Sequence, residues 1–159
     1  MMSIEKAKAH LAAYGMADKV LEFSVSSATV ELAAKALGCE PAHIAKSILL
    51  GQPDGTYLVL AAGDAKLDNR KFKDRFGTKP KMMPYDMVEE AVGHAPGGVC
   101  PFGIKEGISV WLDESLRRFS VVYPAAGSSN SAVPMTMNEL ETASRALGWV
   151  DVCKLPEEA

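Results

Sequence analysis

Residues 44–50, Ile-Ala-Lys-Ser-Ile-Leu-Leu, have the apolar and β-branched composition that is typical of a buried strand. Residues 53–55, Pro-Asp-Gly, follow as a strong turn signal, and residues 57–62 form a second apolar run, Tyr-Leu-Val-Leu-Ala-Ala. A tight turn between two such runs predicts an antiparallel hairpin. We expect this hairpin to belong to a central sheet.

Lys46 interrupts the first of these runs. Side chains alternate along a strand, so Lys46 shares its face with Ile44, Ile48 and Leu50, the bulkier and core-directed side. Burial of an ammonium group lowers its pKa and makes the neutral amine accessible near neutral pH, as in catalytic lysines. A lysine near a strand end that reaches water along its aliphatic stem fits the same residues. The segment alone leaves both interpretations open.

The rest of the chain alternates between helical and extended patterns. We expect helices over residues 3–14, 30–37, 68–76, 85–92 and 136–148, and strands over residues 20–25, 108–112 and 121–126. Ser3 is expected to cap the first helix, and Thr136 with Glu139 forms a capping-box signature at the start of the last one, which should end near Gly148. This order predicts an α+β (mixed α/β) fold, and the length favours a single domain over residues 1–159.

Composition limits the class of protein. The 159 residues contain no apolar run near the roughly 20 that a membrane helix requires, and the first residues lack the hydrophobic region of a signal peptide. The cysteines, Cys39, Cys100 and Cys153, are odd in number and far apart, which disfavours a disulfide framework and a structural zinc site. The three histidines are scattered as well. We therefore expect a soluble cytoplasmic protein without a metal site.

The charge is unevenly distributed along the chain. The net charge of −3 argues against an indiscriminate nucleic-acid binder. Residues 65–81 nevertheless contain seven basic and two acidic side chains, a local charge of +5. This segment fits a surface that meets phosphates, although a charge run of this kind more often belongs to a solvated helix face.

Two loops are candidates for a binding site. Residues 94–103, His-Ala-Pro-Gly-Gly-Val-Cys-Pro-Phe-Gly, allow the backbone to approach a ligand closely and to present N–H groups to an oxyanion or a carbonyl. Residues 127–131 form a second turn of small polar residues. Either loop could also be a plain surface connection. Cys100 with His94 nearby suggests a cysteine nucleophile as a competing mechanism, although Cys100 is more economically a small loop side chain.

Five ordered elements give the chain a resemblance to the YbaK/ProX family of aminoacyl-tRNA editing domains, which includes free-standing deacylases and the insertion domain of some prolyl-tRNA synthetases. The resemblance spans nearly the whole chain and implies a central mixed, partly barrel-like sheet flanked by helices. The elements are residues 31–38 leading to 44–47, residues 62–64, residues 97–103, residues 111–113, and residues 126–128 before 138–140.

The resemblance also implies an activity and a site. Members of the family hydrolyse the ester that joins a wrong amino acid to the terminal adenosine of tRNA, without a metal or other cofactor. The essential lysine of the family falls on Lys46 and its G-x-x-x-P loop on residues 97–101. The implied catalytic residues are Lys46, Gly97, Gly98 and Val99, and the implied substrate-binding residues are Ser47, Pro101, Phe102, Gly127, Ser128, Ser129 and Asn130.

The implied chemistry needs few groups. An aminoacyl ester is already activated, so it requires mainly a positioned water and stabilisation of the developing oxyanion. We assign Lys46 to orienting the substrate and stabilising charge, and it acts as a general base only if its pKa is strongly lowered. The amides of residues 97–99 would bind the carbonyl, and a ribose 2′-hydroxyl would assist the water. The expected substrate is tRNA(Pro) carrying alanine, cysteine, serine or threonine.

Two other classes of function remain open on the sequence. A noncatalytic module that binds the aminoacyl group or tRNA would keep the pocket without the reaction, and a structural domain would share only the architecture. The implied partner is the acceptor end of a mischarged tRNA, with no DNA and no membrane, and the sequence leaves open a prolyl-tRNA synthetase partner and the oligomeric state. From charge alone, the candidate tRNA-binding residues are Lys66, Arg70, Lys71 and Lys73.

Overall fold

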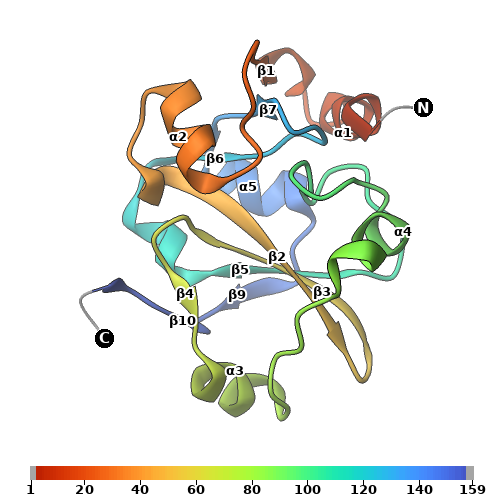
Figure 1. Cartoon of the computed structure of the whole chain (residues 1–159), viewed down its shortest axis with the longest axis vertical. Helices are drawn as coiled ribbons and strands as arrows, with labels where there is room; N and C mark the ends of the chain where they lie inside the picture. Colours follow the sequence, from red (N-terminus) through yellow and green to blue (C-terminus); the bar gives the residue numbers. More distant parts are fainter. Residues whose placement is uncertain (1–2, 157–159) are drawn as a thin grey trace.

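The computed structural model describes residues 3–156, whose centre is a curled, six-stranded mixed sheet with the shape of a half-barrel (Figure 1). The strand order is β8-β6-β2-β3-β5-β9. This mixed α+β architecture confirms the expected fold class. The strands of the sheet are β2 (Ile44–Gln52), β3 (Gly55–Ala62), β5 (Ser109–Asp113), β6 (Val121–Pro124), β8 (Met135–Thr136) and β9 (Gly148–Val150).

The predicted hairpin forms the middle of this sheet. β2 and β3 pair antiparallel from Ala45 opposite Ala62 to Gln52 opposite Gly55, and each has a parallel neighbour on its other side, β6 beside β2 and β5 beside β3. Residues 58–62 of β3 are completely buried. A strand covered on both faces has a continuous apolar run instead of an alternating one, which explains the composition of residues 57–62.

Two short ribbons lie outside the main sheet. β1 (Leu21–Glu22) pairs with β7 (Ser131–Ala132), and β4 (Lys66–Leu67) pairs with β10 (Cys153–Lys154), both antiparallel. The strand expected over residues 20–25 is therefore reduced to two residues. Both residues of β1 are exposed, so little apolar burial favours a longer strand there.

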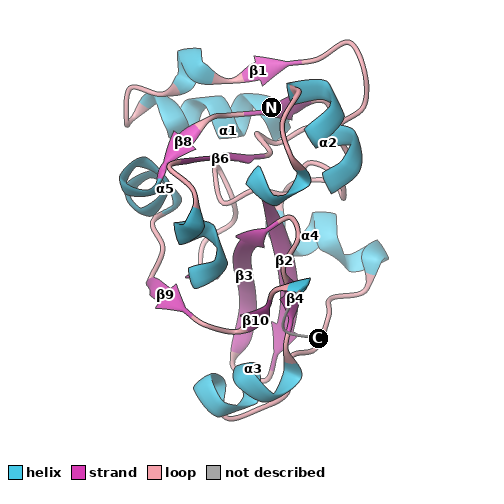
Figure 2. Ribbon diagram, turned by 90° about the vertical axis from the view of Figure 1, so that its left-hand side faces the viewer, coloured by secondary structure: helices cyan, strands magenta, loops and turns pink. Residues whose placement is uncertain are grey.

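Helices cover the sheet and occupy both ends of the molecule. α1 and α2 lie at one end and α3 at the opposite end (Figure 2). No helix within residues 3–156 is both long enough and apolar enough to span a membrane. The helices are α1 (Ser3–Ala12), α2 (Val30–Leu37), α3 (Asn69–Phe76), α4 (Val88–Val92) and α5 (Met137–Ser144), with short 3-10 turns η1 (Ala17–Lys19), η2 (Pro41–His43), η3 (Tyr85–Met87) and η4 (Glu114–Arg118).

The helix ends follow the capping signals with two exceptions. Thr136 and Glu139 form the predicted capping box of α5, and Thr29 caps α2. α5 nevertheless ends at Ser144, because Arg145 adopts a left-handed conformation (φ 55°) and Gly148 opens β9 beside β5. Ser3 is part of α1, and its hydroxyl donates to the carbonyl of Gly93 at 3.2 Å. Tertiary pairing thus overrides the local pattern at both places.

Candidate active site

A cavity of about 320 Å³ lies along β2, between α2, the loop of residues 94–103 and residues 82–88. Figure 1 shows α2 and α4 on either side of β2. Most of the lining is apolar, with few polar groups, as is usual for small-molecule sites. Ala33 of α2, Ala45 and Leu49 of β2, Val88 of α4 and Val99 of the loop supply apolar walls.

Lys46 lines this cavity with its ammonium group held by backbone. Nζ donates to the carbonyl oxygen of Gly63 at 3.3 Å and to that of Ala65. Both acceptors belong to the turn that follows β3. Within residues 3–156 these are the hydrogen bonds of Nζ, so the third N–H of the ammonium is available to a ligand.

Opposing effects act on the pKa of Lys46. Partial burial lowers it below its usual value, while the negative charges of Asp64 and Glu31 oppose that shift. The two carbonyl acceptors also favour the charged form, because they can only accept. This environment suits a lysine that donates hydrogen bonds as an ammonium better than one that removes a proton.

Asp64 is itself paired. Arg118 donates to it in a bidentate arrangement, Nη2 to Oδ1 at 2.5 Å and Nη1 to Oδ2 at 3.1 Å. These hydrogen bonds lower the pKa of Asp64 below its usual range. Asp64 therefore remains a carboxylate near neutral pH and keeps a negative charge near Lys46.

Gly63 supports this arrangement through its lack of a side chain. A Cβ at this position would lie 2.0 Å from the carbonyl oxygen of Pro41 and 2.8 Å from Cγ1 of Val30. Only glycine fits between η2 and α2 with its carbonyl directed to Lys46. The sequence pointed to residues 62–64 as a family element, but it gave no sign of this role.

The loop of residues 97–101 supplies the opposite wall of the cavity. Gly97 and Val99 line it, and no hydrogen-bond partner for their N–H groups occurs within residues 3–156. The N–H of Gly98 donates to the carbonyl of Ala95 at 3.0 Å. Two of the three predicted amides therefore have no hydrogen-bond partner within the described residues, whereas that of Gly98 stabilises the loop.

The turn of residues 127–130 lies behind this loop, and its four residues are not among those that line the cavity. Oγ of Ser128 is hydrogen-bonded to Oδ1 of Asn130 at 2.9 Å, and Nδ2 of Asn130 donates to the carbonyl of Phe23. The carbonyl of Ser129 accepts from the N–H of Ser27 at 2.6 Å. The side chains of Ser128 and Asn130 are thus engaged within the protein, whereas Ser129 is exposed, and the turn supports the cavity wall from outside.

Pro101 and Phe102 are buried in the core and do not line the cavity. Cys100 and His94 are fully buried beside them, with Sγ 3.5 Å from Nε2, and they too lie off the cavity wall. Burial raises the pKa of the Cys100 thiol to about 12. Because the nucleophile of a cysteine enzyme is the thiolate, the environment of Cys100 does not fit that role.

The four predicted basic residues lie in different places. Lys71 of α3 donates to the carbonyl of Cys153 at 2.8 Å and pairs with Asp151 at 3.2 Å. Arg70 and Lys73 are exposed on the same helix, at the end of the molecule opposite α2 (Figure 1). Lys66 of β4 lies near enough to Lys46 for its charge to lower the pKa of Lys46. None of the four lines the cavity.

Two hydroxyl groups in the cavity are unusual. Oγ of Ser27 and Oγ of Ser47 are buried and have no hydrogen-bond partner within residues 3–156. Such groups are rare in native structures, because an unsatisfied buried hydroxyl costs about 1–3 kcal/mol. Ser47 was predicted from the family pattern. Ser27 was not predicted. Within residues 3–156, no three His, Cys, Asp or Glu side chains are grouped to hold a metal.

This half-barrel with a lysine-containing cavity is the aminoacyl-tRNA editing domain. Residues 25–143 match the model of that family, so the chain belongs to it. It is 46% identical over 154 residues to the uncharacterized protein YwhH of Bacillus subtilis (strain 168), covering 96% of this chain and 98% of that protein.

Two further relatives have names that refer to prolyl-tRNA synthetase. The solved structure of a proposed trans-editing enzyme for prolyl-tRNA synthetase has a TM-score of 0.86 and 30% identity, over 96% of this chain and 97% of that one. A proline–tRNA ligase of Limosilactobacillus fermentum is 28% identical over 95 residues, which are 56% of this chain but 17% of the ligase. Both relatives are thus linked to prolyl-tRNA synthesis.

Proposed function

We propose that this protein is a trans-acting deacylase that hydrolyses the ester bond of a mischarged tRNA. The observation that supports this most directly is the half-buried ammonium of Lys46, which is held by two carbonyls with one N–H left over. It lies in a cavity that Gly97 and Val99 also line, and their amides have no partner within residues 3–156. Donors of this kind suit an oxyanion.

In the proposed reaction a water molecule attacks the ester carbonyl, and the carbonyl oxygen becomes an oxyanion. Lys46 and the amides of Gly97 and Val99 donate hydrogen bonds to that oxygen. The 2′-hydroxyl of the terminal ribose assists in removing a proton from the water. Collapse of the intermediate breaks the bond to the 3′ oxygen, which takes up a proton and leaves as the free ribose, while the amino acid leaves as its carboxylate. No protein nucleophile takes part.

The proposed substrate is tRNA(Pro) carrying a small wrong amino acid. The likeness to proteins linked to prolyl-tRNA synthetase supports the tRNA, and the cavity volume supports a small acyl group. The unpartnered hydroxyls of Ser27 and Ser47 favour serine or threonine over alanine or cysteine, because a hydroxyl on the substrate would complete their hydrogen bonds.

The proposal is tested by measuring deacylation by the purified protein. The substrates are the alanyl, cysteinyl, seryl, threonyl and prolyl esters of tRNA(Pro). We expect hydrolysis of the seryl and threonyl esters, and a fall in kcat of about 10²- to 10³-fold in Lys46→Ala, the usual effect of removing one oxyanion donor. Lys105→Ala, which changes an exposed lysine that does not line the cavity, is the matched control. Binding of these esters by the wild type without hydrolysis of any of them would identify a noncatalytic module instead.

A further inference from the structure

The cavity leaves part of the proposed substrate outside. Its volume of about 320 Å³ is at the lower end of the range for sites that enclose a drug-sized ligand. The acyl group and the ribose must reach Lys46 for the reaction to occur. The nucleobase is attached to the far side of that ribose, so it would lie at the mouth of the cavity.

The mouth of the cavity carries an unusually exposed aromatic side chain. Tyr85 and Met82 line the cavity, yet they are 79% and 62% exposed. Within residues 3–156, the hydroxyl of Tyr85 has no hydrogen-bond partner, and its ring has no aromatic neighbour. Nothing in the fold requires a large aromatic ring at this position, and exposed aromatic rings are the usual stacking surface for unpaired bases.

Tyr85 is held in place by its backbone neighbours. The N–H of Met83 donates to the carbonyl of Leu49 at 3.1 Å, and that of Gly51 donates to the carbonyl of Lys81 at 2.9 Å, so residues 81–83 are fixed against β2. Pro84 then restricts the chain directly before Tyr85. A ring on a fixed segment loses little conformational freedom when it binds a ligand.

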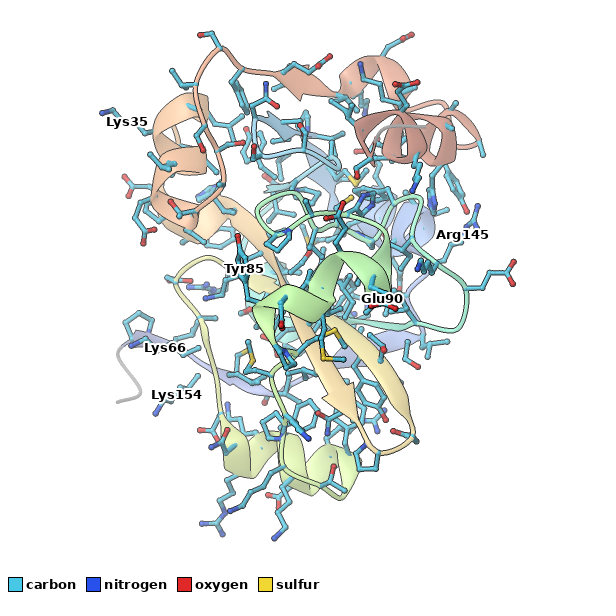
Figure 3. The ribbon with its side chains drawn as sticks, turned by 45° about the vertical axis from the view of Figure 1, so that its right-hand side comes forward. Lys35, Lys66, Tyr85, Glu90, Arg145 and Lys154 are labelled. Atoms are coloured by element: carbon cyan, nitrogen blue, oxygen red, sulfur yellow. The ribbon has the colours of Figure 1, made fainter. Side chains whose placement is uncertain are left out.

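Positive charge lies on the same side of the molecule. Lys66 and Lys154 lie opposite each other in the register of the β4–β10 ribbon, and Figure 3 shows both projecting from the edge of the molecule below the level of Tyr85, with Lys35 of α2 on the same side above it. All three belong to segments outside α3. Lysines in such positions would meet the phosphates of a strand that enters the cavity by its 3′ end.

We propose that Tyr85, with Met82, binds the terminal nucleobase of the substrate by stacking, and that the preceding phosphates lie over Lys66 and Lys154. This inference rests on the proposed function, because it places the base from the position of the ester. A single-stranded nucleic acid fits the combination of an exposed ring and nearby lysines better than a protein partner, for which the apolar area would be continuous.

The inference is tested by the kinetics of Tyr85→Ala and Tyr85→Phe with aminoacyl-tRNA and with the matching 3′-aminoacyl ester of 1-O-methylribose. This second ester keeps the 2′-hydroxyl that the proposed reaction uses and has no base. We expect Tyr85→Ala to raise KM for the tRNA roughly 5- to 150-fold, the effect of losing one stacked base. Tyr85→Phe should retain the wild-type KM, and hydrolysis of the ribose ester without a base should be the same in all three proteins. Leu147→Ala, at an exposed apolar residue that does not line the cavity, is the control.

Binding of a labelled single-stranded oligonucleotide ending in CCA, measured by fluorescence anisotropy, makes the test independent of catalysis. Weaker binding by Tyr85→Ala but not by Tyr85→Phe supports the stacking role even if the wild type hydrolyses no ester, an outcome that would remove only the proposed function. Equal KM and equal oligonucleotide binding in Tyr85→Ala and wild type would overturn the inference. An equal loss on the ribose ester without a base would also overturn it, because it would show that Tyr85 maintains the cavity instead.

Discussion

At the scale of single residues, Lys46 shows how burial and hydrogen bonding act on one ammonium group in opposite directions. Burial favours the neutral amine, whereas the carbonyls of Gly63 and Ala65 and the charge of Asp64 favour the ammonium. This arrangement suits a role in which the ammonium form of Lys46 donates a hydrogen bond to the substrate. It offers a concentrated positive charge in a partly desolvated place, where electrostatic interactions are stronger than in water.

This assignment predicts the pH dependence of deacylation. Because the pKa of Lys46 lies below its ordinary value, the ammonium is lost at a lower pH than in a free lysine. The enzyme-dependent rate, with spontaneous hydrolysis subtracted, should therefore fall as pH rises through that pKa. Lys46→Arg cannot lose its charge in this range, so whatever activity it retains should not show the fall. A wild-type rate that rises to a plateau over the same interval, and is absent in Lys46→Arg, would instead identify Lys46 as a general base.

At the scale of elements, the site depends on two loops that approach each other at backbone distance. A Cβ on Gly98 would lie 2.8 Å from N and Cα of Ser128, and a Cβ on Gly97 would lie 3.1 Å from Cβ of Ala28. Gly127 packs in turn against the carbonyl of Ser3 at the start of α1. The wall of the cavity is thus positioned by segments that are far apart in the sequence.

Gly98→Ala tests this contact. Because the atoms that it would meet are backbone, they cannot move aside, and the loop with the amides of Gly97 and Val99 must shift. We expect a loss of about 1–3 kcal/mol in the free energy of unfolding, and a larger loss of deacylation than the stability change explains. Gly107→Ala is the control, since its Cβ meets nothing within 4 Å but its φ of 87° strains alanine by a similar amount. Equal activity of the two variants would show that the position of the loop does not matter.

At the scale of the whole molecule, sequence patterns were informative where one local signal acts alone. The run of residues 57–62 and the capping box at Thr136 correctly predicted a hairpin and a helix start. The end of the last helix was wrong, because Gly148 is drawn into a strand beside β5 by pairing that no local pattern encodes.

The candidate site divides in the same way. Lys46 and the loop of residues 97–101 carry recognisable motifs. By contrast, the roles suggested for Ser27 and Tyr85 depend on which segments surround the cavity, so their chemistry becomes visible only when the chain is folded. Most of the charge of residues 65–81 is on α3, at the far end of the molecule from α2, so the basic run does not itself indicate where the cavity lies.

Two histidines connect the site to the stability of the whole fold. His10 accepts from the N–H of Gly103 through Nδ1 and donates through Nε2 to the carbonyl of Ala143, so its ring is neutral. These two hydrogen bonds join α1 to α5 and to the end of the loop of residues 94–103. His94 is fully buried, with Nε2 at 2.6 Å from the carbonyl of Phe102. Burial lowers the pKa of both below the ordinary value.

This predicts a loss of stability in mild acid. As pH falls below the unfolded-state pKa of about 6.5, the unfolded chain binds protons that the native histidines do not, so the free energy of unfolding decreases until the native pKa values are reached. The slope is at most about 1.4 kcal/mol per pH unit for each histidine. Urea unfolding between pH 8 and pH 5 measures it, and His10→Gln should reduce it. Thr136→Ala, which removes a helix cap worth about 1 kcal/mol, should lower stability equally at each pH. If His10→Gln behaved like Thr136→Ala, the pH dependence would come from other groups, and His10 would be only a packing contact between helices.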